Sequence, residues 1–428
     1  MGDVFCRAHF ALLVGYALLG KGFAYLGIAP MYVGELSLAL GLAVALSTGA
    51  LIRIPRSPTL TLLIVFQVWC GVRAASGLSH YGVETLRDSV IWGYGLFAIV
   101  TASVLAARPY RLAWFLSAYG VFARLFLMLM PLLWIVYVTY GDALPRVPGT
   151  DVGLVHLKSA DVLTHLAGIA SFQLVGLSST SIASLVLFWI GCGALSVHTR
   201  GGMLAFLSAV GLVCALEPMR RRVWIAAAAT LAIVPIVLFA DLGVAVRHRE
   251  ISGRQLVDNA LSIVGLAESR RLSSTRSWRL DWWSKIVEDT VFGRHFWWGR
   301  GFGVNLASDD GFATDRSGSL RSPHNGHMTL LARGGVPAAV LWALLQASWV
   351  AKMSTAYRQS RRDGQPRWSK LYLFLLAYWM AYMVNATFDV YLEGPMGGIW
   401  FWTLFGIGLA APAVQAKSPG TVEAGATR

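Results

Sequence analysis

Long apolar runs joined by short polar connections fill most of the chain, and they predict membrane-spanning helices. A spanning helix needs about 20 mostly apolar residues, and about twelve runs approach that length. The sequence therefore predicts an all-α polytopic integral membrane protein. The predicted spans cover residues 8–20, 31–52, 59–75, 88–107, 112–138, 161–177, 180–197, 201–216, 223–240, 328–350, 370–388 and 396–414.

One long polar segment, residues 241–325, interrupts this series of spans. It carries twelve Lys and Arg residues and ten Asp and Glu residues, so its net charge is small. Loops of this length usually have a function or a fold of their own. Within it, residues 276–289 predict an amphipathic helix at the membrane interface, where indole rings are favourable. The apolar positions at helical spacing are Trp278, Trp282, Trp283 and Ile286.

The distribution of Lys and Arg predicts the orientation of the spans. With the amino terminus inside, the inner segments hold sixteen of these residues and the short outer segments hold six. Because basic residues are enriched in cytoplasmic loops, we expect both termini in the cytoplasm and the long loop outside. The predicted organisation is an N-terminal bundle of about nine helices (1–240), a large extracytoplasmic loop (241–327), C-terminal transmembrane helices (328–415) and a disordered cytoplasmic tail (416–428).

Composition narrows the class of protein further. Of the 428 residues, 56% are hydrophobic and 14% are charged, and the mean hydropathy is +0.58, whereas soluble domains carry about 25% charged residues. These values exclude a soluble enzyme, a coiled coil and a disordered chain. The net charge of +14 follows the topology and does not indicate nucleic-acid binding. The four cysteines form no C-x-x-C pair, so we expect neither a disulfide framework nor a thiolate metal site.

The segment RSPHNGHMTLLARGG, residues 321–335, lies where the long loop re-enters the membrane and is the strongest candidate for chemistry. A histidine such as His324 is the side chain best suited to accept a proton near neutral pH. A turn that only caps the next helix would explain the His324–Asn325 pair equally well. His324 and His327 are three residues apart and could form a metal pair, but no H-E-x-x-H pattern or clear third ligand accompanies them.

Two arginines outside this segment are candidates for binding phosphate. Arg200 lies in the block TRGGM between two predicted spans at the outer face, and Arg279 lies in WRLDWW. A guanidinium group presents a fixed fork of donors that matches phosphate oxygens. Taken alone, however, the residues favour an interfacial anchor for Arg200, and for Arg279 a surface ion pair with Asp281 or Glu288.

Three further features carry less information. Arg124 lies near the middle of a predicted span, where a charge is costly, so it is either functional or paired, for example with Glu35. Asp161 and His165 share a helix face and predict a polar patch near the outer surface. The run G-R-G-F-G at 299–303 has no preceding strand, so it predicts a tight turn and not a dinucleotide-binding loop.

Together these segments resemble the O-antigen ligase / O-antigen polymerase superfamily, whose members handle polyprenyl-linked glycans in bacterial envelopes. The strongest match is RSPHNGHMTLLARGGVPAAVLW at 321–342, where an H-N pair precedes a hydrophobic stretch, a glycine pair and an apolar helix. Other family-like segments are TRGGMLAFL at 199–207, WSKIVEDTVFGRHFWWGRGFGVN at 283–305 and GKGFAYLGIAPMYVGE at 20–35. The layout of about twelve helices with one long outer loop is also similar to the family.

The resemblance implies roles for five residues. His324 and Arg200 would be the catalytic residues, with Arg200 binding the pyrophosphate of the donor. Arg279 and Arg321 would be additional loop cations that face the pyrophosphate, and Asn325 would bind substrate beside His324. The resemblance also implies a GT-C-type glycosyltransferase fold and a reaction that needs no metal ion or other cofactor.

The implied reaction transfers a glycan from a polyprenyl-pyrophosphate carrier to an acceptor hydroxyl and inverts the anomeric carbon. Arginines would stabilise the leaving pyrophosphate, and His324 would either remove the proton of the acceptor hydroxyl or hold the pyrophosphate as a cation. The implied partners are the lipid-linked glycan donor, a glycan or lipid-core acceptor and membrane lipids. The implied location is the bacterial inner (plasma) membrane, with the active site on the extracytoplasmic face.

An O-antigen ligase and an O-antigen or exopolysaccharide polymerase share this donor chemistry, so the motifs do not distinguish them. A lipid-linked glycan flippase or another secondary transporter is the alternative from a different class. Transporters usually show two similar halves and short external loops. Here the halves differ and a long outer loop separates them, which favours the enzyme.

Overall fold

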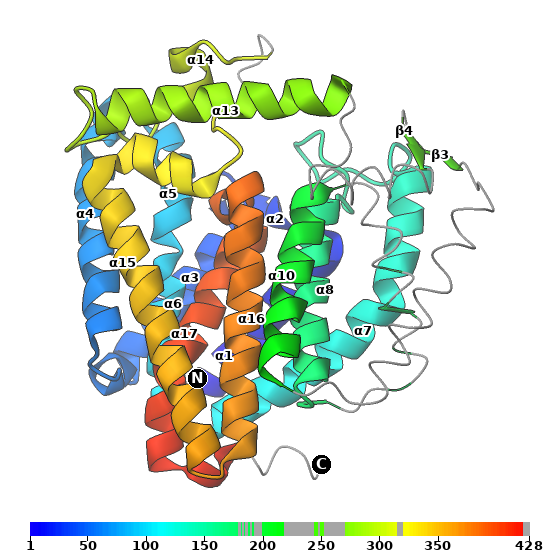
Figure 1. The fold of residues 1–428 in the computed structure, drawn as a ribbon, viewed down its shortest axis with the longest axis vertical. Helices are drawn as coiled ribbons and strands as arrows, with labels where there is room; N and C mark the ends of the chain where they lie inside the picture. The colour runs from blue at the N-terminus through cyan, green and yellow to red at the C-terminus, as the bar shows by residue number, and fades with distance from the viewer. Residues whose placement is uncertain are drawn as a thin grey trace.

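A computed structural model of the chain describes residues 1–178, 181, 184, 187, 188, 191, 199–217, 244–246, 249–251, 270–314 and 320–422. Within these residues most helices stand side by side along one long axis (Figure 1). The elements in chain order are α1 (Gly2–Leu19), α2 (Lys21–Ala24), β1 (Gly27–Ile28), β2 (Met31–Tyr32), α3 (Val33–Ser47), η1 (Ala50–Arg53), α4 (Pro58–Tyr81), α5 (Val83–Gly93), α6 (Gly95–Ala107), α7 (Tyr110–Tyr140), α8 (Ser159–Leu174), α10 (Arg200–Leu216), β3 (Val244–Val246), β4 (Arg249–Ile251), α13 (Arg270–Val291), α14 (Leu306–Asp310), α15 (Gly326–Arg362), α16 (Pro366–Phe388), η2 (Tyr391–Glu393), α17 (Pro395–Lys417) and η3 (Pro419–Thr421). The two short strand pairs, β1–β2 and β3–β4, are antiparallel.

Ten of the twelve predicted spans coincide with described helices. In the described part of the chain, six helices are long and apolar enough to cross a membrane: α1, α4, α7, α15, α16 and α17. The pair α5 and α6, bent by 45°, would make a seventh, while α3 and α10 are shorter apolar helices. The predicted spans 180–197 and 223–240 lie largely or wholly outside the described residues. The helical membrane protein is thus confirmed, and the total of twelve spans stays a prediction.

Small residues let the upright helices pack closely. A Cβ at Gly406 of α17 would lie 2.6 Å from the carbonyl oxygen of Ala98 on α6. A Cβ at Gly168 of α8 would lie 2.6 Å from the ring of Tyr378 on α16. Backbones that approach this closely gain van der Waals contact where lipid offers no hydrophobic driving force between helices.

Helix α15 is kinked at Gly335, whose φ of 75° lies in the left-handed region. Pro337 follows and has no N–H to donate to the carbonyl of Arg333, one turn earlier. The amide of Gly301 in the outer loop donates to that carbonyl instead, at 2.9 Å. A Cβ at position 335 would lie 2.7 Å from the carbonyl oxygen of Phe296, so glycine is required for this approach. The kink therefore docks the outer loop onto the first turns of α15.

The predicted turn at 299–303 is confirmed by the backbone of its glycines. Gly299, Gly301 and Gly303 have φ values of 58°, 87° and 104°, which side chains with a Cβ rarely adopt. A Cβ at Gly299 would also press against the backbone of Arg333. The glycines therefore allow the backbone of the turn to approach the backbone of the kinked helix closely.

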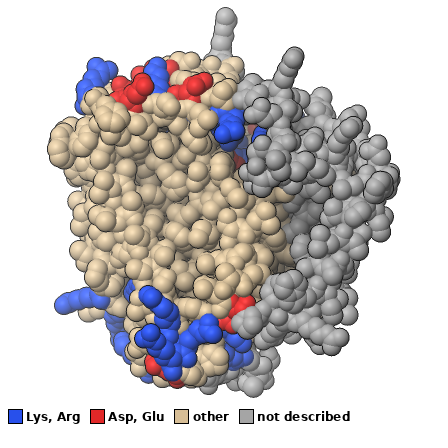
Figure 2. Space-filling model, in the orientation of Figure 1, with Lys and Arg blue, Asp and Glu red and all other residues tan. Residues whose placement is uncertain are grey.

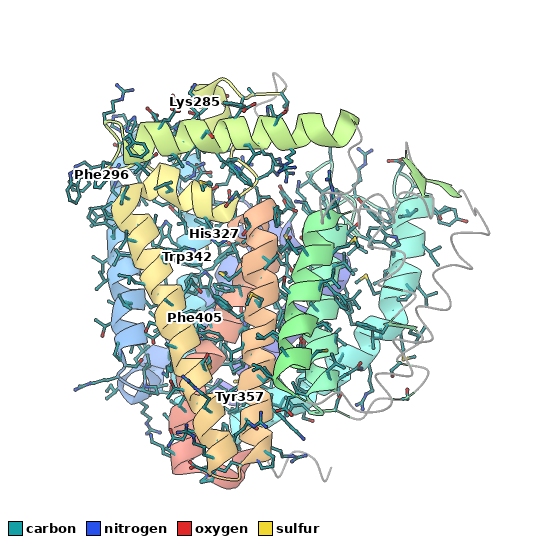
Figure 3. All side chains as sticks on the ribbon, in the orientation of Figure 1. Lys285, Phe296, His327, Trp342, Tyr357 and Phe405 are labelled. Atoms are coloured by element: carbon teal, nitrogen blue, oxygen red, sulfur yellow. The ribbon has the colours of Figure 1, made fainter. Side chains whose placement is uncertain are left out.

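The predicted amphipathic helix 276–289 is confirmed as part of α13, which lies across the upper ends of the upright helices (Figure 1). Its apolar face covers protein and not lipid, because Trp282 and Ile286 are fully buried against α14 and the first turns of α15. Trp282 donates from Nε1 to Asp310 at 2.7 Å, a partner that makes this burial favourable for an indole. Lys285, labelled on α13 in Figure 3, donates to the carbonyl of Asp310 at 2.7 Å.

The two ends of the molecule differ in charge. On the face shown in Figure 2, Lys and Arg gather at the lower end, whereas the upper end carries both signs of charge. The amino terminus is held by an ion pair of 2.7 Å between Asp3 and Arg111, the second residue of α7.

The carboxy-terminal tail differs from its prediction. Trp368 of α16 donates to the carbonyl of Pro419 at 2.7 Å, and Val422 is buried. The predicted disorder from residue 416 onwards is therefore wrong as far as Val422, because the tail finds an indole partner and an apolar site at the foot of α16. Residues 423–428 lie outside the described part.

Candidate functional site

Residues on both sides of His324 fix the turn that enters α15. Asn325 is the N-cap of that helix, and its Oδ1 accepts a hydrogen bond from the amide of His327 at 3.0 Å. Trp283 of α13 donates from Nε1 to the carbonyl of Pro323 at 2.9 Å. Between these anchors His324 has a φ of 51°, a left-handed conformation that is uncommon outside glycine. Local strain of this kind persists only where the surroundings hold it, and it clusters at functional sites.

The helix-capping interpretation therefore describes Asn325, which is buried and engaged with backbone amides. The structure gives Asn325 a positioning role, whereas its predicted substrate contact stays a prediction. His324 takes no part in the cap, and its side chain is 34% exposed. Of the two interpretations of the His324–Asn325 pair, the helix cap therefore applies to Asn325, and the proton acceptor can apply only to His324.

Asp389, directly after α16, faces the imidazole of His324. Its Oδ1 lies 3.8 Å from Nδ1 of His324 and 3.7 Å from Nζ of Lys158, and it accepts a hydrogen bond from the amide of Val390 at 2.7 Å. Burial alone would raise the pKa of Asp389, but the imidazole, the ammonium group and the amide together hold it at about 2. Asp389 is therefore a carboxylate at neutral pH.

Two arginines from different elements meet beside this carboxylate. Arg279 of α13 donates to the carbonyl of Phe388 at 3.0 Å. Arg200 begins α10, and the next residue, Gly201, lies against Phe388, where an added Cβ would be 2.7 Å from Cβ of Phe388. Burial lowers the pKa of Arg279, the charge of Asp389 opposes that shift and the charge of Arg200 adds to it. Figure 1 shows the upper ends of α10 and α16 beneath α13.

These contacts concentrate positive charge next to a histidine–carboxylate pair. The charge of Arg276, on α13, also acts on Arg200. Guanidinium groups held in this way can bind an oxyanion that carries more than one negative charge. The imidazole can exchange a proton beside it. The site is thus suited to group transfer with an anionic leaving group.

Arg321 lies in a different network. Its guanidinium group contacts Glu84 at 3.0 Å and Asp88 at 3.1 Å, and it donates to the carbonyl of Gly303 at 2.8 Å. Asp88 also contacts the fully buried Arg333 at 2.8 Å. Two carboxylates therefore balance the charge of Arg321, and the network ties the outer loop to α5 and α15. Its predicted role at the pyrophosphate stays a prediction that these contacts do not favour.

The possible metal pair of His324 and His327 finds no support in the geometry. Both ring nitrogens of His327 are engaged, Nε2 with the carbonyl of Met383 at 3.3 Å and Nδ1 with Nε1 of Trp342 at 3.1 Å (Figure 3 labels His327 and Trp342). Within the described residues, no group of three or more His, Cys, Asp or Glu side chains could hold a metal ion.

Arg124 and Glu35 do not form the pair that the sequence suggested. Arg124 is exposed on the surface of α7. Glu35 instead accepts hydrogen bonds from the hydroxyl of Tyr94 at 2.6 Å and the amide of Tyr32 at 3.1 Å. Glu35 therefore caps the first turn of α3 and accepts a hydrogen bond from Tyr94, at the junction of α5 and α6.

The sequence predicted a polar patch near the outer surface at Asp161 and His165, but His165 is buried among aromatic side chains. His165 bonds through Nδ1 to the hydroxyl of Tyr378 at 2.7 Å and through Nε2 to that of Tyr391 at 3.1 Å. Asp161 lies one turn earlier on α8, near Lys158.

Sequence reasoning missed Asp389 and Lys158. Asp389 is 65 positions from His324 and lies in a short apolar connection between two spans, so nothing local marks it. One signal could have identified it. Asp389 directly follows the predicted span 370–388, at the end expected to lie on the same side of the membrane as the long loop. Lys158 carries the same signal before α8.

Fold and site together define a helical membrane protein with a cationic, histidine-containing site at one end of its bundle. Comparison with known families matches residues 185–343 to the O-antigen ligase family. The match confirms the resemblance to the O-antigen ligase / O-antigen polymerase superfamily, and it indicates a glycosyltransferase-like membrane enzyme of polysaccharide assembly. The matched segment contains Arg200, Arg279 and His324. None of the curated proteins compared with the chain matches it.

Proposed function

We propose that the protein transfers a glycan from a polyprenyl-pyrophosphate carrier to an acceptor hydroxyl during assembly of an envelope polysaccharide. The reaction inverts the anomeric carbon and needs no metal ion. The enzyme has a GT-C-type fold, lies in the bacterial inner membrane with both termini in the cytoplasm, and works on the extracytoplasmic face. The acceptor is a lipid core in a ligase or a second lipid-linked glycan in a polymerase.

One observation carries this proposal. Arg200 and Arg279 come from parts of the chain about 80 residues apart, yet the charge of Arg200 acts on Arg279, which bonds to the carbonyl of Phe388 directly before the Asp389–His324 pair. All three cationic or basic side chains lie in the segment that matches the O-antigen ligase family. A convergent set of two guanidinium groups and an imidazole is what departure of a pyrophosphate and activation of a hydroxyl require.

The arginines act on the donor. A polyprenyl pyrophosphate is a good leaving group whose negative charge grows as the glycosidic bond breaks. Fixed guanidinium groups stabilise that charge without reorganising, and removal of one such donor typically costs about 10²–10³-fold in rate. The positive charge of Arg200 adds to the lowering of the pKa of Arg279 by burial, so the two guanidinium groups repel each other without a ligand. An anion between them removes that repulsion.

His324 acts on the acceptor. Its Nδ1 faces Asp389, which leaves Nε2 to receive the proton of the acceptor hydroxyl as the oxygen attacks the anomeric carbon. Asp389 stays ionised and stabilises the imidazolium as it forms. Attack opposite the departing pyrophosphate gives inversion. A positioned base of this kind contributes about 10²–10⁴-fold to the rate.

The distribution of charge favours the proposed orientation. Basic side chains gather at the end of the molecule opposite α13 (Figure 2). Cytoplasmic segments are enriched in Lys and Arg, so that end faces the cytoplasm. The site beneath α13 then opens to the extracytoplasmic side.

Substitution of the two central residues tests the proposal. We expect Arg200→Ala and His324→Ala to lower glycan transfer by at least about 10²-fold, because they remove the pyrophosphate ligand and the base. Purified variants should keep the wild-type elution volume and melting temperature. Arg146→Ala and His80→Ala, which alter exposed side chains of the same types, should transfer at the wild-type rate.

Normal transfer by both central variants would contradict the catalytic assignment. A chelator provides the second arm of the experiment. Excess EDTA should leave the rate unchanged, whereas loss of activity that added divalent metal restores would contradict the metal-independent mechanism.

A further inference from the structure

A second group of basic residues adjoins the proposed site from the amino-terminal side. The amide of Lys21 donates to the carbonyl of His156 at 2.9 Å, and Gly20 forms a β-bridge with His156. Gly20 has a φ of 65°, and a Cβ there would collide with the carbonyl oxygen of His156. The chain between α1 and α2 is therefore locked against the segment that enters α8. This fixes Lys21 close to His156 and Lys158.

The positive charges of Lys21 and Lys158 repel each other, and they disfavour a proton on His156. Burial lowers the pKa of Lys21, and the charges of Lys158 and Arg87 lower it further. Burial also lowers the pKa of His156, and Lys21 and Lys158 add to that shift. Bringing half-buried cations together is unfavourable unless an anion offsets their repulsion.

The carboxylates of the site balance only one of the two lysines. Lys158 lies 3.7 Å from Asp389, and although burial would lower its pKa, Asp389 and Asp161 raise it overall. Lys21 has an aromatic neighbour instead, with its Nζ 5.7 Å from the ring centre of Tyr25. Among the residues that the structure describes, no carboxylate forms an ion pair with Lys21. The positive charge in excess therefore lies at Lys21.

This basic group is connected to the reacting centre through Asp389. Oδ1 of Asp389 lies 3.7 Å from Nζ of Lys158 and 3.8 Å from Nδ1 of His324. Of the arginines proposed to serve the donor pyrophosphate, Arg279 bonds to the carbonyl of Phe388, one residue earlier, and Arg200 precedes Gly201, which packs against Phe388. Lys158 is thus linked through Asp389 to the proposed base, and Lys21 lies on the far side of Lys158 in this chain of contacts. The lysines differ from the donor site in both residue type and origin.

We infer that Lys21, His156 and Lys158 form an anion subsite for a phosphate or carboxylate group carried by the acceptor glycan. Ammonium groups are compact point charges on flexible stems, which suits an oxyanion whose position varies with the glycan. The subsite holds the acceptor so that its hydroxyl reaches His324. This inference rests on the proposed glycan transfer, because it names the second substrate of that reaction.

Inhibition by inorganic phosphate tests the subsite during turnover. We expect phosphate to compete with the acceptor, and Lys21→Ala to weaken that inhibition about tenfold, the loss of one charge-assisted contact. The KM for the donor should stay unchanged. Lys21→Arg should retain the inhibition because it keeps the charge, and Arg146→Ala, another outer-face cation, serves as the matched control. Competition with the donor only, or equal inhibition of wild type and Lys21→Ala, would overturn the inference.

Direct binding separates this inference from the proposed reaction. Calorimetric titration of phosphate into Arg200→Ala protein, with and without Lys21→Ala, measures the subsite without turnover. Lys21-dependent binding supports the subsite even if no transfer is found, and its absence overturns the subsite even if transfer proceeds. The titration is repeated in phosphatidylcholine vesicles with and without phosphatidylglycerol. Loss of phosphate binding in the anionic vesicles would assign the subsite to a lipid headgroup and overturn the acceptor role.

Discussion

The conformation of His324 follows from its neighbours. Pro323 has no N–H and is held through its carbonyl by Trp283, while Asn325 must keep an extended backbone to cap α15. His324 joins these two fixed residues and takes the left-handed conformation between them. The cost of such a conformation is about 1–3 kcal/mol, and the indole and capping hydrogen bonds offset it. The result is an imidazole that points away from the cap and towards Asp389.

Asp389→Asn tests the role of the carboxylate in turnover. We expect kcat to fall by about 10²-fold, because the amide cannot stabilise the imidazolium that forms during proton removal. The KM for the lipid-linked donor should change little, since Asp389 does not bind the pyrophosphate. Steady-state rates at neutral pH give both parameters. A variant with normal kcat and a raised donor KM would contradict the assignment, and Asp389→Glu should recover part of the rate.

Asp389 should also stabilise the fold in a pH-dependent way. Its pKa is depressed from 3.8 to about 2, so the ionised side chain stabilises the folded protein by about 2 kcal/mol above pH 4. That contribution is lost as the pH falls from 4 towards 2. Wild type should therefore melt above Asp389→Asn at pH 7, and the difference should shrink below pH 4. A difference that is independent of pH would contradict the depressed pKa.

At the scale of elements, α13 lies across the upper ends of the upright helices and is held there by its buried apolar face. Trp282 and Ile286 are fully buried, and Trp282 donates to Asp310, which also binds the buried Arg300 at 2.6 Å. The same helix presents Arg279 to Phe388 and Trp283 to Pro323 on its lower side. Docking of α13 therefore places both Arg279 and the turn that holds His324.

Substitutions on two faces of α13 separate docking from helix formation. We expect Trp282→Ala to weaken docking by about 3–5 kcal/mol, because it removes a buried indole and its hydrogen bond. Leu280→Ala, at a position that is 45% exposed on the same helix, should have little effect. Limited proteolysis and hydrogen exchange of residues 292–314 measure the difference. Equal protection of the two variants would contradict this account of α13.

The sequence predicted elements better than it predicted contacts. Apolar runs and the spacing of indoles were sufficient for the described helices and for α13, because both reflect local periodicity. The kink at Gly335 is marked by Pro337, but its pairing with Gly301 joins positions far apart in the chain.

The same limit applied to the site. His324 and Arg200 were proposed as site residues because each lies in a recognisable local block, and that proposal stays a prediction. The contacts of Asp389 with His324 and of Arg321 with Asp88 could not be predicted, since only the fold shows which carboxylate each cation meets. Interhelical partners of this kind are set by packing and not by neighbouring residues.

At the scale of the whole molecule, the end rich in Lys and Arg lies opposite the end that carries the candidate site. On the face shown in Figure 2 the lower end is rich in Lys and Arg, whereas the upper end carries α13, the kinked turn of α15 and the candidate site (Figures 1 and 2). Between them the described helices pack around a continuous apolar core. In the proposed orientation the site lies at the membrane surface, where it can receive a carrier lipid from the bilayer and a glycan from water, as the proposed transfer requires.

Reconstituted transfer tests this account most directly. Purified protein in phosphatidylcholine vesicles is given a polyprenyl-pyrophosphate-linked glycan, with or without a lipid-core acceptor, and the products are separated by size. We predict release of polyprenyl pyrophosphate in step with glycan transfer, as a ladder of longer lipid-linked chains or as a single product that requires the core. Movement of intact glycolipid across the vesicle membrane without any release of carrier would contradict the account and identify a transporter.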